Sequence, residues 1–279
     1  MFRAQDMTPI LAGKDSIFDQ PAWLALTAPK LFNPEYPDAE RVEEYLSRFV
    51  VRLPRLVRLT RTAKQNPMDE IACADAATLA THLYLDTLED WIRRVTTMGL
   101  VRTVPTTEPS CVPLTARSCE FASARVFKRI VLYWRLRCLV SGCILTLLQV
   151  KAAHMPSFAA AAAVLLDKLG EGATASVQSH EERAAECIAM SVQWAMTSPS
   201  PFPVYKLLVV SPLMNAFGVW MRSERRPTNV ADSQRARNLQ VWAVEQITAI
   251  ARTIHAPEMG VAQLEAMNMV LMGGPLPGV

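Results

Sequence analysis

Three carboxylates in one short stretch have the spacing that most suggests chemistry. Asp86, Glu89 and Asp90, in the sequence LDTLEDW, stand at positions i, i+3 and i+4. On a continuous helix this spacing places the side chains on one face. Carboxylate oxygens are preferred ligands of divalent cations such as Mg²⁺. The stretch therefore raises the hypothesis of a metal site.

A diphosphate-processing site, such as that of a terpene cyclase, would need a second set of ligands. That set consists of Asn, then Ser or Thr, then Glu, at four-residue steps. Asn229 and Ser233 fit the first two positions, but the third is Arg237. Because a cation stands where a ligand is needed, we predict no metal and no cofactor. We interpret the three carboxylates as an exposed helix face supported by arginines one turn further on.

A run of arginines offers the second candidate site. Its members could contact an acidic protein or, less favoured, a phosphate backbone. Their spacing rotates them around much of a helix, so a solvated helix face is the competing interpretation. The candidate partner contacts are Arg48, Arg52, Arg55, Arg58 and Arg61.

Motifs of other enzyme classes are missing from the sequence. The chain contains no GxSxG, GxGxxG or P-loop pattern, which disfavours hydrolases and nucleotide-dependent enzymes. The four histidines have no metal-ligand spacing, and the six cysteines contain no CxxC pair. We predict buried, reduced thiols in an intracellular protein, and no catalytic residues.

The elements that must position these side chains are predicted to be helices. Glu120–Gln149 has apolar residues at three- and four-residue steps, as an amphipathic helix requires. Its apolar run 138–150 holds 13 residues, whereas a membrane span needs about 20, so we predict a buried helix. Pro54 and Pro212 predict helix restarts, and we expect Val101–Thr115 to be an exposed loop. No alternating run is long enough to predict a strand.

Composition supports one helical domain. Of the 279 residues, 51% are hydrophobic and only 10 are Gly, which favours an all-α protein with a large core. Residues 1–37 contain five prolines and are predicted to form an extended arm anchored by Trp23 and Leu26. Residues 38–275 are predicted to form a single multi-helix domain. The six tryptophans are expected to pack in the hydrophobic core, although Met and Trp side chains could also line a pocket for an apolar small molecule.

Several segments resemble, in their order, the regulatory region of fungal zinc-cluster transcription factors of secondary metabolism. They are PAWLALTAP, RLPRLV, LATHLYLDTLEDWIRR, FKRIVLYWRLRCLVSGCILTLLQ, RAAECIAMSVQWAM and VSPLMNAFGVWMRSE. The features of the family correspond to a Leu-Glu-x-Trp helix at Leu88–Trp91, a Tyr-Trp-Arg helix at Tyr133–Arg135 and a Pro-Leu helix at Pro212–Trp220. The resemblance covers about residues 20 to 275 and implies an all-α effector region.

The chain departs from that family at the DNA-reading module. A binuclear zinc cluster needs six closely spaced cysteines, whereas here they are spread from Cys73 to Cys187. The net charge of +3 does not indicate a nucleic-acid-binding surface. We therefore expect no direct DNA binding by this chain alone and no membrane association.

The resemblance implies a regulator of a biosynthetic gene cluster, located in the nucleus or in nucleus and cytoplasm. It would act through a protein partner, either a zinc-cluster factor or a coregulator, and a homodimer is one possible assembly. The alternative is a biosynthetic enzyme of the cyclase type on the same helical scaffold, with a terpene-derived or polyketide-derived substrate.

Overall fold

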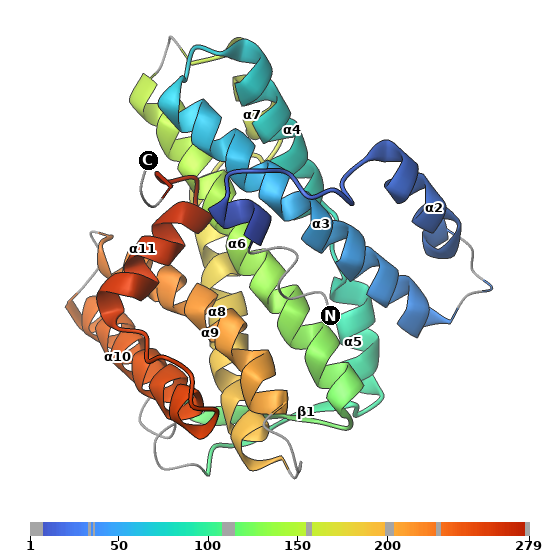
Figure 1. Cartoon of the computed structure of the whole chain (residues 1–279), viewed down its shortest axis with the longest axis vertical. Coiled ribbons are helices and arrows are strands. Elements are labelled where there is room, and N and C mark those ends of the chain that lie inside the picture. Colours follow the sequence, from blue (N-terminus) through green and yellow to red (C-terminus); the bar gives the residue numbers. More distant parts are fainter. Residues whose placement is uncertain are drawn as a thin grey trace. The chain divides into compact units, whose positions relative to one another are not determined.

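The protein is all-α, as its composition predicts. A computed structural model describes residues 8–32, 35, 37–107, 115–154, 158–198, 204–226 and 230–276. These residues form helices joined by short connections, with one two-stranded sheet (Figure 1). The elements are α2 (Pro21–Phe32), α3 (Asp38–Gln65), α4 (Glu70–Leu85), α5 (Glu89–Thr97), β1 (Val101–Pro105), β2 (Arg117–Phe121), α6 (Ala124–His154), α7 (Ala160–Asp167), α8 (Ala173–Thr197), α9 (Val204–Glu224), α10 (Val230–Thr253) and α11 (Val261–Leu271).

The chain divides into two compact units, each made from separate stretches of sequence. Unit 1 comprises Met1–Leu88, Leu139–Gln178 and Met269–Val279, and unit 2 comprises Glu89–Cys138 and Ser179–Asn268. The helices α6, α8 and α11 each contribute residues to both units. Neither unit is therefore a contiguous segment of the sequence.

The core of unit 1 forms around α3 and α4. The inner face of α3 contributes Phe49, Leu53 and Leu56, all of which are fully buried or nearly so. The helix α4 packs against both α3 and α7. Its Asp69 is the N-cap, because the carboxylate accepts a hydrogen bond from the amide of Ala72 at 3.0 Å and so satisfies an otherwise unpaired helix-end donor.

The core of unit 2 is rich in aromatic rings. Phe121, Phe127 and Trp194 lie together with ring centroids 4.6 to 5.5 Å apart. In the same unit α9 packs along α10, where Trp220 and Trp242 meet edge to face at 6.3 Å. Edge-to-face geometry is a favoured arrangement of aromatic pairs. Trp91, Trp134, Trp220 and Trp242 are buried, as predicted for core residues.

Two prolines predicted to restart helices lie instead inside continuous ones. Pro54 is within α3 and Pro212 within α9. Each removes one main-chain hydrogen bond and disfavours the helix locally. Both prolines are buried among apolar neighbours on their helices, and we attribute the continuity of α3 and α9 to that packing.

A β-hairpin replaces part of the predicted loop. β1 and β2 pair antiparallel, with Val101 opposite Phe121 and Pro105 opposite Arg117. The expectation that Val101–Thr115 is an exposed loop is therefore wrong for β1, and residues 108–114 lie outside the described residues. Because β2 occupies Glu120 and Phe121, the long helix α6 begins later than predicted, at Ala124. Gly99 follows α5 with φ +68°, the left-handed conformation that glycine commonly adopts at helix C-termini.

The predicted extended arm contains a helix. Pro21 opens α2 at its first position, where its fixed φ suits a helix and its missing amide costs nothing. Trp23 and Leu26 were expected to anchor this segment, but their exposed fractions are 48% and 71%. Among the described residues of this segment, Ile10 is a buried hydrophobic side chain, with an exposed fraction of 1%.

Two helices in the described residues are long and apolar enough to cross a membrane by length and composition. They are α6 and α9, and the most apolar windows of these helices are 89% and 56% buried within the protein. Core helices of soluble proteins pass the same test. The burial of α6 agrees with the prediction of a buried helix for its apolar run.

Candidate functional site

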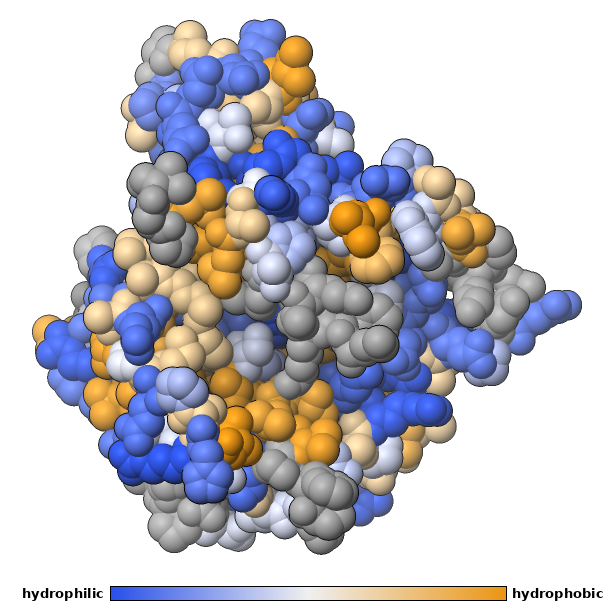
Figure 2. Space-filling view, in the orientation of Figure 1, coloured by the Kyte–Doolittle hydropathy of each residue, from blue (hydrophilic) through white to orange (hydrophobic). Residues whose placement is uncertain are grey.

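Three of the five candidate arginines come together in unit 1. Arg52, Arg55 and Arg58 of α3 line one open hollow with a volume of about 330 Å³. The facing helix α4 contributes Asp75, Thr78, Leu79 and His82 to its wall. In Figure 2 the surface along α3 is mainly hydrophilic, with apolar atoms near α2. We call this site the arginine hollow.

The arginine hollow favours an anionic ligand. Its three guanidinium groups face one lining carboxylate, that of Asp75. Guanidinium groups are planar, permanently charged and matched in geometry to carboxylate and phosphate groups. A ligand that carries carboxylates or phosphates would therefore find complementary charge here.

The chain itself already supplies carboxylates to these arginines. Asp15 accepts two hydrogen bonds from Arg58, at 2.7 Å from Nε and 2.8 Å from Nη2. Asp19 lies with its Oδ2 atom 3.0 Å from Nε of Arg55, and its side chain is only 1% exposed. Both aspartates belong to the non-helical segment between Gly13 and α2. Sequence reasoning missed this pairing, because nothing local connects residues about forty positions apart.

Burial makes Asp19 an unusual carboxylate. It raises the pKa of Asp19 above the ordinary aspartate value, against the opposing fields of Arg55 and Arg52, while nearby Asp15 raises this pKa further. Removing a carboxylate from water disfavours its charged form unless donors replace the lost water. Neither side-chain oxygen of Asp19 has a hydrogen-bond donor in the described structure. The ion pair with Arg55 is therefore close but poorly aligned.

The remaining two arginines of the run differ from these three. Arg48 is half-buried on α3, and it does not line the arginine hollow. Arg61 is 7% exposed and donates from Nε to the main-chain oxygen of Gly274 at 2.7 Å. Arg61 therefore serves the internal packing of unit 1. Its burial makes Arg61 the least accessible of the five candidate partner contacts.

The carboxylates predicted to share a helix face do not share a helix. α4 ends at Leu85 with Asp86 as its C-cap, and a new helix, α5, begins at Glu89. The Asp86 main-chain oxygen accepts a hydrogen bond from Tyr45 at 2.6 Å. This break removes the i, i+3, i+4 geometry on which the metal hypothesis depended. Within the described ranges, no group of three His, Cys, Asp or Glu side chains is placed to hold a metal ion.

The second set required for that metal lies only partly within the described residues. Asn229 lies outside the described residues. Arg237 pairs with Glu224 at 2.8 Å. Asp90 forms an exposed ion pair with Arg93 at 3.1 Å, whereas Glu89 accepts a hydrogen bond from the hydroxyl of Tyr133 at 3.1 Å.

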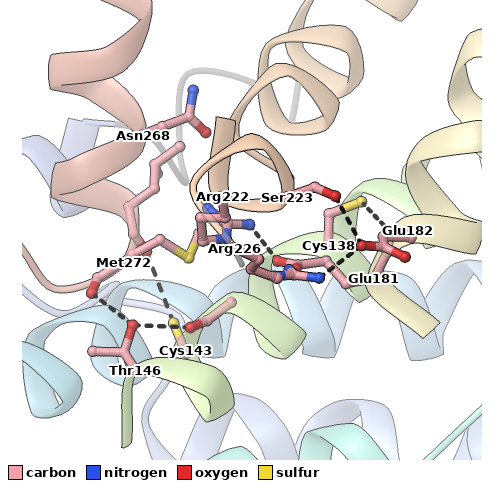
Figure 3. A network of polar contacts seen from close by, with 12 residues as sticks. Cys138, Cys143, Thr146, Glu181, Glu182, Arg222, Ser223, Arg226, Asn268 and Met272 are labelled. Atoms are coloured by element: carbon pink, nitrogen blue, oxygen red, sulfur yellow. Dashed lines mark hydrogen bonds and ion pairs between the residues drawn. The ribbon is translucent and has the colours of Figure 1, made fainter. Parts of the chain in front are cut away.

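Unit 2 contains a buried ion cluster that sequence reasoning also missed. Glu181 of α8 is fully buried and accepts hydrogen bonds from Arg222 and Arg226, at the end of α9 and just beyond it (Figure 3). Arg226 also contacts Glu182 at 2.6 Å, and the Ser223 hydroxyl donates to Glu182 at 3.1 Å. A buried carboxylate needs such donors to remain charged. Here the carboxylate comes from α8 and its donors come from the end of α9 and just beyond it, so the cluster joins these two helices.

A second hollow of about 390 Å³ lies beside this cluster between α8, α9 and α10. Its walls carry Glu182, Glu186 and Asp232 together with Arg183 and Arg235. Glu186 and Arg235 already pair with each other at 3.0 Å. With charges of both signs and an internal ion pair, this hollow favours no single class of ligand.

The described cysteines are mostly buried, as predicted. Cys73, Cys119, Cys138 and Cys143 are buried, Cys187 is half-buried, and all five are unbridged. Burial raises the pKa of Cys187 to about 11 and that of Cys119 to about 12. These thiols are therefore poor nucleophiles at neutral pH. Cys111 lies outside the described residues.

Comparisons of the chain with protein-family models, with curated proteins and with solved structures found no match.

Proposed function

We propose that the chain is the effector region of a transcription regulator that acts by binding another protein. Its ordered set of motifs resembles the regulatory region of fungal zinc-cluster factors, and its all-α architecture is compatible with that resemblance. The supporting observation from the site is the arginine hollow. Three arginines from the predicted contact run line one open surface.

The partner we propose is an acidic segment of a zinc-cluster transcription factor or coregulator. Asp15 and Asp19 illustrate how peptide carboxylates fit these arginines. A nucleic acid is less suited to the same surface. A phosphate backbone presents a continuous row of negative charge and is bound by strongly basic surfaces, whereas the net charge of this chain is only +3. In this proposal the protein acts in the nucleus on the genes of a biosynthetic cluster.

Deleting the gene in the organism that carries it tests this function. A regulator predicts that transcript levels of several neighbouring genes change together, with reintroduced wild-type gene as the control. Normal transcript levels with one accumulating pathway intermediate would instead identify a biosynthetic enzyme. The cyclase alternative has no supporting geometry at Asp86, Glu89 and Asp90, since α4 and α5 are separate helices.

A further inference from the structure

A short acidic segment lies against the arginines to which the proposed partner would bind. We define the acidic strap as residues Asp15–Asp19, which form no helix. Its first residue binds Arg58 and its last approaches Arg55, three positions earlier on α3. The strap therefore runs antiparallel to α3. Both of its ends are attached to unit 1, because Ile10 is buried before it and α2 packs on α3 after it.

The contacts of the strap are weak for so charged a segment. The Asp15–Arg58 pair has good bidentate geometry, but its side chains are 41% and 37% exposed. Ion pairs this exposed contribute little to stability, because water and salt screen them. The Asp19 carboxylate is buried but receives no hydrogen bond in the described structure. Its lost hydration is therefore only partly offset by Arg55.

Two arginines next to the strap have hydrogen-bond donors without an acceptor in the described residues. The Nε atoms of Arg52 and Arg55 are buried and have no hydrogen-bond acceptor in the described residues. Both arginines line the arginine hollow. The strap therefore leaves the hydrogen-bonding capacity of these two arginines incompletely used, and the carboxylates of a peptide could supply the missing acceptors.

We propose that the acidic strap is an internal pseudo-ligand that covers Arg55 and Arg58, and that an acidic peptide of the partner displaces it. The carboxylates of the partner then take the places of Asp15 and Asp19. This inference rests on the proposed function, because it assumes that the arginine hollow is the partner site. It adds that two arginines of the site are already paired with carboxylates of the chain itself in the absence of the partner. A tethered strap competes at high effective concentration, so it lowers the apparent affinity of the site.

Peptide binding to the purified full chain tests this proposal. The probe is fluorescein-labelled deca-glutamate, followed by fluorescence anisotropy at low salt. The variant D15N/D19N removes both strap charges and should bind the probe about tenfold more tightly than the wild type, the equivalent of about 1.4 kcal/mol. The matched control is D90N/E258Q, which changes net charge equally at exposed positions. Equal tightening in the control, or no tightening in D15N/D19N, would overturn the strap.

A second measurement follows the strap directly. Lys14 precedes the strap and is exposed, so trypsin cleavage after Lys14 reports release of the segment. Saturating deca-glutamate should increase this cleavage rate several-fold in the wild type. An unchanged or lower rate would mean that the strap stays in place when peptide binds, which also overturns the proposal.

The two proposals fail in different ways. R52Q/R58Q should lose probe binding while keeping Arg55 as the partner of buried Asp19. Loss of binding in R52Q/R58Q without a gain in D15N/D19N rejects the strap and leaves the hollow as the site. Tighter binding of a random single-stranded DNA than of deca-glutamate rejects the acidic peptide as partner. The proposed function itself fails only if deletion leaves neighbouring transcripts unchanged.

Discussion

The guanidinium group of Arg61 lies 2.7 Å from the main-chain oxygen of Gly274, a residue 213 positions further along the chain. A second hydrogen bond, at 3.4 Å, reaches the main-chain oxygen of Val270. These contacts link α3 to the last turn of α11 and to the residues that follow it. Nearby, the Cys143 thiol lies 3.8 Å from the main-chain oxygen of Leu271 (Figure 3). Residues 270–274 are thus an integral part of unit 1.

Replacing Gly273 by alanine should destabilise unit 1. Gly273 has φ +74°, and an added Cβ would lie 2.8 Å from the amide nitrogen of Arg61. Left-handed strain and overpacking together should lower the free energy of unfolding by about 3 kcal/mol. The control is Gly172→Ala, where φ is +72° and nothing lies within 4 Å, with an expected cost of about 1 kcal/mol. Urea unfolding measures both, and equal losses would contradict the close packing at Gly273.

The buried ion cluster of unit 2 predicts a large effect at Glu181. Glu181→Gln leaves the guanidinium groups of Arg222 and Arg226 without their buried negative charge. Breaking a buried pair in this way costs about 3–5 kcal/mol. Glu186→Gln, which removes an exposed pair with Arg235, should cost less than about 1 kcal/mol. A loss at Glu181 no greater than that at Glu186 in chemical denaturation would refute this account of the cluster.

The sequence could predict those helices whose apolar periodicity is long. The apolar pattern of Glu120–Gln149 predicts a helix, and α6 spans Ala124–His154. The β-hairpin could not be predicted, because each strand has only five residues. The two strands pair with each other across the segment that joins them, and local sequence patterns do not reveal this pairing. Pro54 was a misleading stop signal, since burial on α3 outweighs its local cost. A local sequence pattern predicts which face of a helix is buried, but it does not predict which other segment packs against that face.

The candidate site was predictable only in part for the same reason. The arginine run is visible in the sequence, and three of its members do share one hollow. The burial of Arg61 and the pairing of Arg55 with Asp19 depend on chain segments that return from far away. The metal hypothesis failed because it assumed one continuous helix through Asp86 and Glu89, whereas the chain leaves the helix at Asp86.

The raised pKa of Asp19 predicts a pH-dependent stability difference. Asp19 faces Arg55 and Arg52 of α3 and its neighbour Asp15. The pKa of Asp19 is higher in the folded protein than in the unfolded chain. The folded state therefore loses stability as pH rises from the unfolded-state pKa to the folded-state pKa. Asp19→Asn removes this penalty. The melting temperature of the variant relative to the wild type should therefore increase from acidic to neutral pH, and a decrease would contradict the burial argument.

The thiols should react slowly until the protein unfolds. Burial raises the pKa of Cys187 to about 11. Complete burial also raises the pKa of Cys138. Maleimide labelling at pH 7 followed by mass spectrometry should modify Cys187 first among the five described cysteines, because only it is half-buried. In urea all five should react at similar rates. Rapid labelling of Cys138 in the native protein would show that its surroundings open.

The most direct test of the central claim replaces the arginines of the hollow in the living organism. An R52Q/R58Q allele is compared with R93Q/R252Q, which neutralises two exposed arginines elsewhere, at equal protein levels. Transcripts of the neighbouring genes are measured in both strains. The account predicts that R52Q/R58Q reproduces the deletion, while R93Q/R252Q behaves as the wild type. Wild-type transcript levels in the R52Q/R58Q strain, where deletion changes them, would contradict the arginine hollow as the regulatory contact.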